Sequence, residues 1–103
     1  MIELTESELL ERITEEKRLF VFIYTPFCGT CGVARRMLEV LEQMRPNMPL
    51  AAANILYMPR LTEQWQITSV PCLLKLEDGV PINRLYAMQA IDHVFRFMEP
   101  DPG

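Results

Sequence analysis

The chain has 103 residues, half of them apolar, which predicts one small domain with a buried core. Its formal net charge of −4 argues against nucleic acid or an anionic membrane surface as the main partner. The absence of a long apolar run excludes a predicted membrane-spanning helix, and the acidic start lacks the features of a secretory signal, so we expect a cytoplasmic monomer.

The first half of the chain predicts two helices and two strands. A capping-box sequence, Thr-Glu-Ser-Glu, begins a helix predicted over residues 6–16. The continuous apolar run over 19–24 is typical of a central strand that is covered on both faces. Apolar residues three and four positions apart predict a second helix over 29–45. Residues 50–56 are then predicted to form a second buried strand.

The second half predicts a short helix, a hairpin and a final helix. The short helix spans residues 58–66, and an apolar run over 72–76 predicts a third strand. A Glu-Asp-Gly turn connects this strand to a return strand over 80–86. A proline near the start of the return strand indicates an edge strand or a bulge. Apolar residues at helical spacing over 91–98 predict the last helix.

The resulting element order is α-β-α-β-α-β-β-α, and it predicts an α/β sandwich with a central mixed sheet. Strands separated by helices supply the parallel part of this sheet, and the hairpin supplies an antiparallel pair. We expect one domain over residues 1–99 and a flexible tail over 100–103.

Three cysteines, Cys28, Cys31 and Cys72, give an odd count that does not suit a secreted disulfide framework. In a reducing compartment such cysteines are more often catalytic or metal-binding. Cys28 is placed at the start of the second helix, where unpaired backbone N–H groups stabilise a thiolate and lower its pKa. Cys31 follows one turn later. The pair therefore predicts a nucleophile, Cys28, and a resolving thiol, Cys31.

A metal site is an alternative reading of the same pair. Zinc requires four ligands, and Cys72 and the single histidine, His93, are the remaining candidates for a complete site. Because His93 falls outside the apolar face of the last helix, a complete site within one chain is not expected. We predict no metal and no cofactor, with two buried structural cysteines or a metal site shared between subunits as the alternatives.

The chain resembles the thioredoxin family over nearly its whole length. The resemblance rests on Cys28-Gly29-Thr30-Cys31 after a strand, on Val70-Pro71 before a later strand, and on the Asp-Gly hairpin that follows. It implies a thioredoxin-like three-layer α/β/α sandwich around a central mixed four-stranded sheet. It also implies that Pro71 is a cis-proline that faces the cysteine pair.

Four positions depart from the pattern of this family. Phe22 stands where members usually carry a buried aspartate that is thought to exchange a proton with the resolving cysteine, and Ala52 aligns near the lysine often paired with it. Phe27 replaces the usual tryptophan before the first cysteine. Thr30 replaces the usual proline between the cysteines, and it lacks the fixed φ of proline.

The resemblance implies a thiol–disulfide oxidoreductase in which Cys28 attacks a protein disulfide and Cys31 resolves the mixed disulfide. The implied substrate-binding residues are Phe27, Gly29, Thr30, Val70 and Pro71. Because the chain has no Gly-rich nucleotide fingerprint, it needs an external reductant, such as a thioredoxin reductase or a low-molecular-weight thiol.

Two other functions remain as alternatives. A glutaredoxin-like use of a small thiol fits the Tyr-Thr-Pro-x-Cys opening, but the glycine pair expected after the hairpin is missing. The second alternative is a non-catalytic binding or adaptor module that kept the fold. The departure at Phe22 is the feature that favours this alternative.

Cys72 directly follows Pro71, so we expect it near the cysteine pair. It is either a small buried core residue, a third redox thiol able to pair with Cys31, or a residue that tunes the pocket. Arg35 and Arg36 fall on the polar side of the second helix and are expected to be solvated; lowering the pKa of the first cysteine or steering acidic partners are the alternatives.

Overall fold

The structure is a computed structural model that describes residues 1–99. The flexible tail predicted for 100–103 lies outside the described residues. In the described part of the chain, no helix is both long enough and apolar enough to cross a membrane.

A mixed five-stranded sheet forms the centre of the molecule. Its strands are β1 (Ile2–Glu3), β2 (Arg18–Tyr24), β3 (Leu50–Asn54), β4 (Cys72–Glu77) and β5 (Val80–Leu85). They lie in the order β1-β3-β2-β4-β5. The β1–β3 and β2–β3 pairs are parallel, whereas β2–β4 and β4–β5 are antiparallel. The predicted mixed sheet is confirmed, but it has five strands and not four, because the two-residue β1 is too short to produce a sequence pattern.

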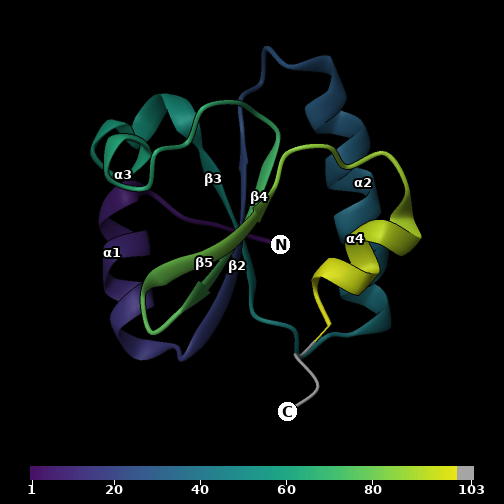
Figure 1. The fold of residues 1–103 in the computed structure, drawn as a ribbon, viewed down its shortest axis with the longest axis horizontal. Helices are drawn as coiled ribbons and strands as arrows, with labels where there is room; N and C mark the ends of the chain where they lie inside the picture. The colour runs from purple at the N-terminus through teal and green to yellow at the C-terminus, as the bar shows by residue number, and fades with distance from the viewer. Residues whose placement is uncertain (100–103) are drawn as a thin grey trace.

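Helices cover both faces of this sheet (Figure 1). They are α1 (Glu6–Glu15), α2 (Gly29–Met44), α3 (Pro59–Gln64) and α4 (Ile91–Phe97), with a short 3₁₀ turn over Ile55–Tyr57. Figure 1 shows α1 and α3 on one side of the sheet and α2 and α4 on the other. The predicted three-layer sandwich is confirmed.

Two apolar layers fill the space between the helices and the sheet. Successive residues of β2 point into opposite layers: Val21 and Ile23 pack in the layer beneath α1 and α3, and Phe20 and Phe22 in the layer beneath α2 and α4. All four are almost completely buried. Burying a side chain of this size contributes about 1.5–3 kcal/mol, so β2 stabilises both layers at once.

Local polar contacts fix where several elements begin and end. Thr5 accepts a hydrogen bond from the backbone N–H of Glu8, whose carboxylate accepts one from the N–H of Thr5, which is the predicted capping box of α1. The strand predicted over 50–56 ends earlier, at Asn54, because the Asn54 side chain accepts a hydrogen bond from the N–H of Leu56 at 3.0 Å. This contact starts the 3₁₀ turn.

The hairpin between β4 and β5 has the predicted Asp-Gly turn. Asp78 and Gly79 have φ angles of 52° and 78°, the left-handed backbone that a two-residue hairpin turn requires. β5 is an edge strand, and the register shifts between Lys75 and Leu76, where Leu76 pairs with Pro81. An edge position and an irregular register are the settings in which a strand tolerates proline.

Candidate active site

The cysteine pair lies where β2 passes into α2. Cys28 is the N-cap of α2, in extended backbone conformation, and Cys31 is in the first turn. The N–H of Cys28 donates to the carbonyl of Thr25 at 3.2 Å, and the N–H of Cys31 donates to the carbonyl of Cys28 at 3.2 Å. These two bonds fix the backbone at the start of α2, and the two thiols lie within one helical turn of each other. All three cysteines of the chain are free thiols.

Cys28 is the more accessible thiol of the pair, and the side chains of Thr30 and Cys31 can donate to it. Its Sγ lies 3.3 Å from the hydroxyl of Thr30. The pKa of Cys28 is lowered, first by the hydrogen bond from the thiol of Cys31, then by that from the Thr30 hydroxyl, and less by the backbone N–H groups of both residues. A lowered pKa increases the thiolate population at neutral pH, and the thiolate is the nucleophilic form.

Cys31 is buried beneath Cys28 and has the opposite electrostatics. Burial, and then the hydrogen bond to Cys28, raise the pKa of Cys31 to about 11. The first thiol is therefore poised to ionise while the second remains protonated. A nucleophile must be ionised while its resolving partner is still protonated, so the opposite pKa shifts of these two neighbouring thiols fit the two roles.

The loop before β4 lies against the cysteine pair. The Sγ of Cys28 lies 3.9 Å from the carbonyl oxygen of Val70 and is placed to donate to it. The peptide bond between Val70 and Pro71 is cis. Thus Val70, forty-two residues away in sequence, lies beside Cys28, and Val70 and Pro71 line one groove together with Thr30, whereas Gly29 does not line that groove.

A groove of about 450 Å³ continues from this point between α2 and the segment that follows β5. It is lined by Thr30, Val33, Val70, Pro71, Tyr86, Ala87, Met88 and Gln89. Phe27, which directly precedes Cys28 in the sequence, has 86% of its surface exposed. An exposed aromatic side chain and a groove therefore flank the accessible thiol, and the residues from Tyr86 to Gln89 had no sequence signal that linked them to the site.

Cys72 directly follows Pro71 in the sequence, but its side chain lies on the opposite face of the sheet from Cys31. It is completely buried and pairs in register with Ile23 of β2, so both side chains point into the layer beneath α1 and α3. Cys31 belongs to the layer on the opposite face. Burial raises the pKa of Cys72 to about 11. The structure therefore does not bring Cys72 together with Cys31.

Arg35 departs from the expected solvated face, whereas its neighbour Arg36 is exposed as predicted. The guanidinium of Arg35 lies over the ring of Tyr24, 4.6 Å from its centroid, and 5.5 Å from the centroid of Phe22. Its Nη2 is 3.8 Å from a carboxylate oxygen of Glu3. The position of Arg35 one turn after Cys31 was visible in the sequence, but the rings and the carboxylate beneath it were not.

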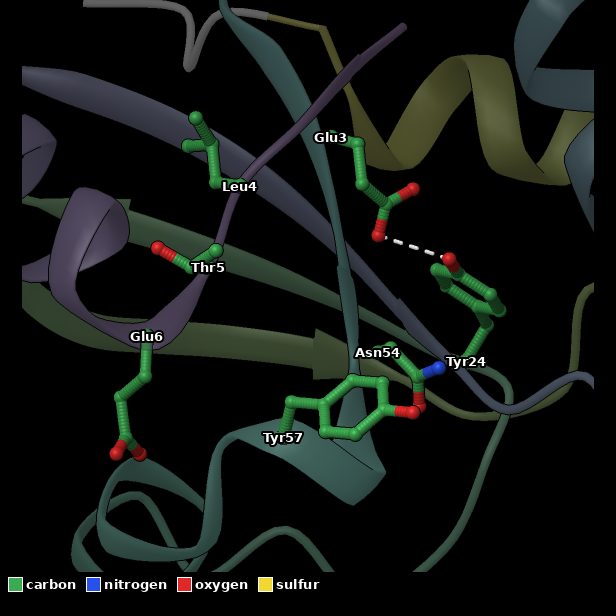
Figure 2. A pocket seen from close by; sticks show the side chains of 7 residues that line it. All are labelled: Glu3, Leu4, Thr5, Glu6, Tyr24, Asn54 and Tyr57. Carbon is green, nitrogen blue, oxygen red and sulfur yellow. Dashed lines mark hydrogen bonds between the residues drawn. The ribbon is translucent and has the colours of Figure 1, made fainter.

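Tyr24 and Glu3 also line a second hollow, of about 360 Å³, shown in Figure 2. There the hydroxyl of Tyr24 donates to the other carboxylate oxygen of Glu3 at 2.8 Å. The pKa of Tyr24 is raised, first by burial and then by this contact, so its hydroxyl stays protonated at neutral pH. None of the three cysteines lines this hollow.

Metal ligands do not converge at the site. Within residues 1–99, no group of three or more His, Cys, Asp or Glu side chains is placed to hold a metal ion. His93 is exposed on α4.

Comparison with known proteins agrees with the fold and the cysteine pair. The chain belongs to the thioredoxin family, whose model, described as Thioredoxin, matches residues 1–99. It is 36% identical over 99 residues to the thioredoxin-like protein YusE of Bacillus subtilis, covering 96% of this chain and 92% of that protein. It is 21% identical to a thioredoxin of Chlamydia trachomatis, over 95% of this chain and 96% of the relative.

Solved thioredoxins share the fold at low sequence identity. A thioredoxin of Plasmodium falciparum superimposes with a TM-score of 0.86 at 17% identity, covering 95% of this chain and 96% of that one. Mitochondrial thioredoxin 3 of Saccharomyces cerevisiae gives a TM-score of 0.82 at 19% identity, covering 95% and 92%. The resemblance first seen in the motifs is confirmed, and family and fold are those of thiol–disulfide oxidoreductases.

Proposed function

We propose that the protein reduces disulfide bonds in other proteins by thiol–disulfide exchange. One observation carries the proposal: Cys28, with a lowered pKa, lies accessible at the N-terminus of α2, while Cys31, with a raised pKa, is buried one turn behind it. Membership of the thioredoxin family supports the same chemistry.

The first step is attack by the Cys28 thiolate on one sulfur of a substrate disulfide. A bond forms between Cys28 and that sulfur, and the other substrate sulfur leaves as a thiolate with the electron pair of the broken bond. The hydroxyl of Thr30 and the thiol of Cys31 stabilise the attacking anion before this step, because both donate to it. The product is a mixed disulfide between Cys28 and the substrate.

The second step is resolution by Cys31. After losing its proton, Cys31 attacks the Cys28 sulfur, and the remaining substrate sulfur leaves as a thiolate. The protein is then oxidised as a Cys28–Cys31 disulfide, and the substrate has gained two electrons. A reductant must return those electrons, and we propose a thioredoxin reductase or a low-molecular-weight thiol in the cytoplasm.

The substrate segment lies, in this proposal, across Phe27 and into the groove that begins at Thr30. Val70 supplies backbone groups for pairing with an extended segment, and Pro71 supplies an apolar wall. Recognition through main-chain groups accommodates many substrate sequences, so specificity rests on the few side chains that line the groove.

The proposal is tested by reduction of a model protein disulfide, such as that of insulin, with dithiothreitol as the electron source. We expect catalysis by the wild-type protein and none by Cys28→Ser. Cys31→Ser should accumulate a mixed disulfide with the substrate, detectable by mass spectrometry. Catalysis that persists in Cys28→Ser, or wild-type protein that gives no rate above dithiothreitol alone, would contradict the proposed activity.

A further inference from the structure

A small hollow is lined by both cysteines of the pair. It has a volume of about 210 Å³ and opens beside α2. It is lined by Tyr24, Thr25, Pro26, Cys28, Gly29, Cys31, Gly32 and Arg35. Glycines at 29 and 32 contribute no side chain to it, and a Cβ added at either would contact nothing within 4 Å. Both cysteines of the pair and Arg35 therefore line the same hollow.

The guanidinium in this hollow is held by contacts on two sides. The ring of Tyr24 stacks on that of Phe22, with centroids 5.6 Å apart and planes 9° from parallel. Arg35 lies over both rings, and its Nη2 approaches Glu3 of β1. The Tyr24 hydroxyl donates to the other oxygen of the same carboxylate (Figure 2). Arg35 is thus a cation in a defined position and not a freely moving surface side chain.

The resolving step requires the thiolate of Cys31, and burial disfavours this charged form. Cys31 must ionise before it attacks Cys28, yet burial disfavours its thiolate. A nearby positive charge offsets that cost, and a charge bordering a partly closed hollow is screened less than one on the open surface.

We propose that Arg35 is the positioning residue of the resolving step: its guanidinium, held by Tyr24 and Glu3, favours the thiolate of Cys31 as that thiolate attacks the Cys28 sulfur. This inference rests on the function proposed above and goes further, since it assigns a role to a residue outside the cysteine motif. Arg35 touches neither the substrate nor a reacting atom.

The other described polar groups on this side of the sheet do not supply a positive charge to Cys31. From β2, Phe22 presents an apolar ring and Tyr24 a protonated hydroxyl engaged with Glu3. The carboxylate of Glu3 faces Arg35 and not the thiol, and it reduces the effect of the guanidinium without cancelling it, because the two are 3.8 Å apart and partly exposed.

Charged side chains on β4 and α4 contact residues other than those that line the hollow. Lys75 of β4 lies over the ring of Phe20, 6.0 Å from its centroid, and Phe20 is two residues along β2 from the ring beneath Arg35. On α4, Arg96 and Asp92 pair with each other at 3.6 Å on the exposed side. Among the described charged side chains, Arg35 alone lines the hollow that both cysteines also line.

The step is balanced without a further reagent. Cys31 releases its proton to water in the hollow, and its thiolate donates an electron pair to the Cys28 sulfur. The bond between Cys28 and the substrate sulfur breaks, and the substrate thiolate leaves with that pair and takes a proton from water. Arg35 exchanges neither protons nor electrons, because its guanidinium remains charged throughout.

The test measures ionisation of Cys31 directly, without a substrate. In a Cys28→Ala background, the rate of Cys31 alkylation by iodoacetamide is followed against pH by mass spectrometry of the peptide that carries it. Arg35→Met keeps an apolar stem but removes the charge, and Arg35→Lys keeps the charge. Arg36→Met, at the exposed neighbouring position, is the matched control.

We expect Arg35→Met to move the alkylation profile to higher pH and to lower the rate at pH 7 by about threefold to tenfold. Arg35→Lys should restore most of the rate, and Arg36→Met should leave it unchanged. An unshifted profile in Arg35→Met would overturn the inference. So would an Arg35→Lys profile equal to that of Arg35→Met, because loss of ring packing and not loss of charge would then be responsible.

A second measurement tests whether Arg35 affects the rate of the resolving step itself. Cys28 is converted to its mixed disulfide with 5-thio-2-nitrobenzoate at low pH, and release of the coloured thiolate is followed after a jump to pH 7. Arg35→Met should slow release by the same factor as alkylation. Release that depends on Cys31 in the wild type but not on Arg35 would overturn the inference and leave the proposed function intact, whereas release independent of Cys31 would contradict the proposed function itself.

Discussion

Cys72 provides a sharp test of how the sheet separates the three thiols. It is completely buried on the face opposite Cys31, and its pKa of about 11 leaves roughly one molecule in ten thousand as thiolate at pH 7. We therefore predict that Cys72→Ala leaves the Cys28–Cys31 redox equilibrium and the rate of disulfide reduction unchanged, whereas it lowers stability.

The cost in stability follows from the environment of the Cys72 sulfur. Cys72→Ala removes one buried heavy atom, which costs about 1–2 kcal/mol when the transfer and cavity contributions are added. Cys72→Ser keeps the volume but buries a hydroxyl among apolar side chains, which adds a desolvation penalty of about 1–3 kcal/mol if the hydroxyl finds no partner. Serine should therefore be the more damaging substitution although it is the closer in shape.

Urea unfolding of the reduced protein measures both variants. The fluorescence of Trp65 is a suitable signal, because this single tryptophan is only 4% exposed and packs in the same layer as Cys72. A loss of 1 kcal/mol corresponds to a fall of about 4–8 °C in Tm for a domain of this size. Slower disulfide reduction by Cys72→Ala, or a Cys31–Cys72 disulfide in the oxidised protein, would refute the reasoning.

Three further predictions follow from individual contacts. Gly32→Ala should stabilise the protein by about 0.5–1 kcal/mol in urea unfolding, because the added Cβ meets nothing, whereas Gly79→Ala should destabilise it, because φ is +78° and Ile13 lies 3.4 Å away. Raising the pH from about 9 towards 11 should destabilise the reduced protein. The raised pKa values of Cys31 and Cys72 keep these thiols protonated in the folded state, whereas the same thiols ionise at lower pH in the unfolded chain. Cys72→Ala should therefore lose less stability over this pH range. Phe27→Ala should leave stability within about 0.5 kcal/mol of the wild type but raise KM for a protein disulfide more than for a small one.

Local sequence signals predicted most of the fold. The capping box of α1, the continuous apolar run of β2 and the Asp-Gly turn each depend on contacts between residues close in sequence, so their patterns are visible without the tertiary structure. The two-residue β1 was missed because its only support is pairing with β3.

The position of the cysteine pair at the start of a helix was predictable for the same reason. The lowered pKa of Cys28 has a different main cause from the one expected, because the side chains of Cys31 and Thr30 contribute more than the backbone N–H groups. For Cys72, the predicted alternative of a small buried core residue is confirmed, whereas the predicted closeness to the pair is wrong. Adjacency to Pro71 indicated closeness, but the alternation of β4 and its register with Ile23 turn the side chain to the other face. Arg35 was misjudged because its partners, Tyr24 and Glu3, come from two other strands.

The measurement that tests the account most directly is a redox titration in glutathione or dithiothreitol buffers, with alkylation and mass spectrometry to identify the paired cysteines. We predict one two-electron transition that joins Cys28 to Cys31, with Cys72 free throughout, and a potential near about −270 mV, where a reductase operates. A potential of about −180 mV or above would assign disulfide exchange or oxidation in place of reduction. If Cys28 and Cys31 remained unpaired under oxidising conditions, thiol–disulfide exchange at this site would be contradicted.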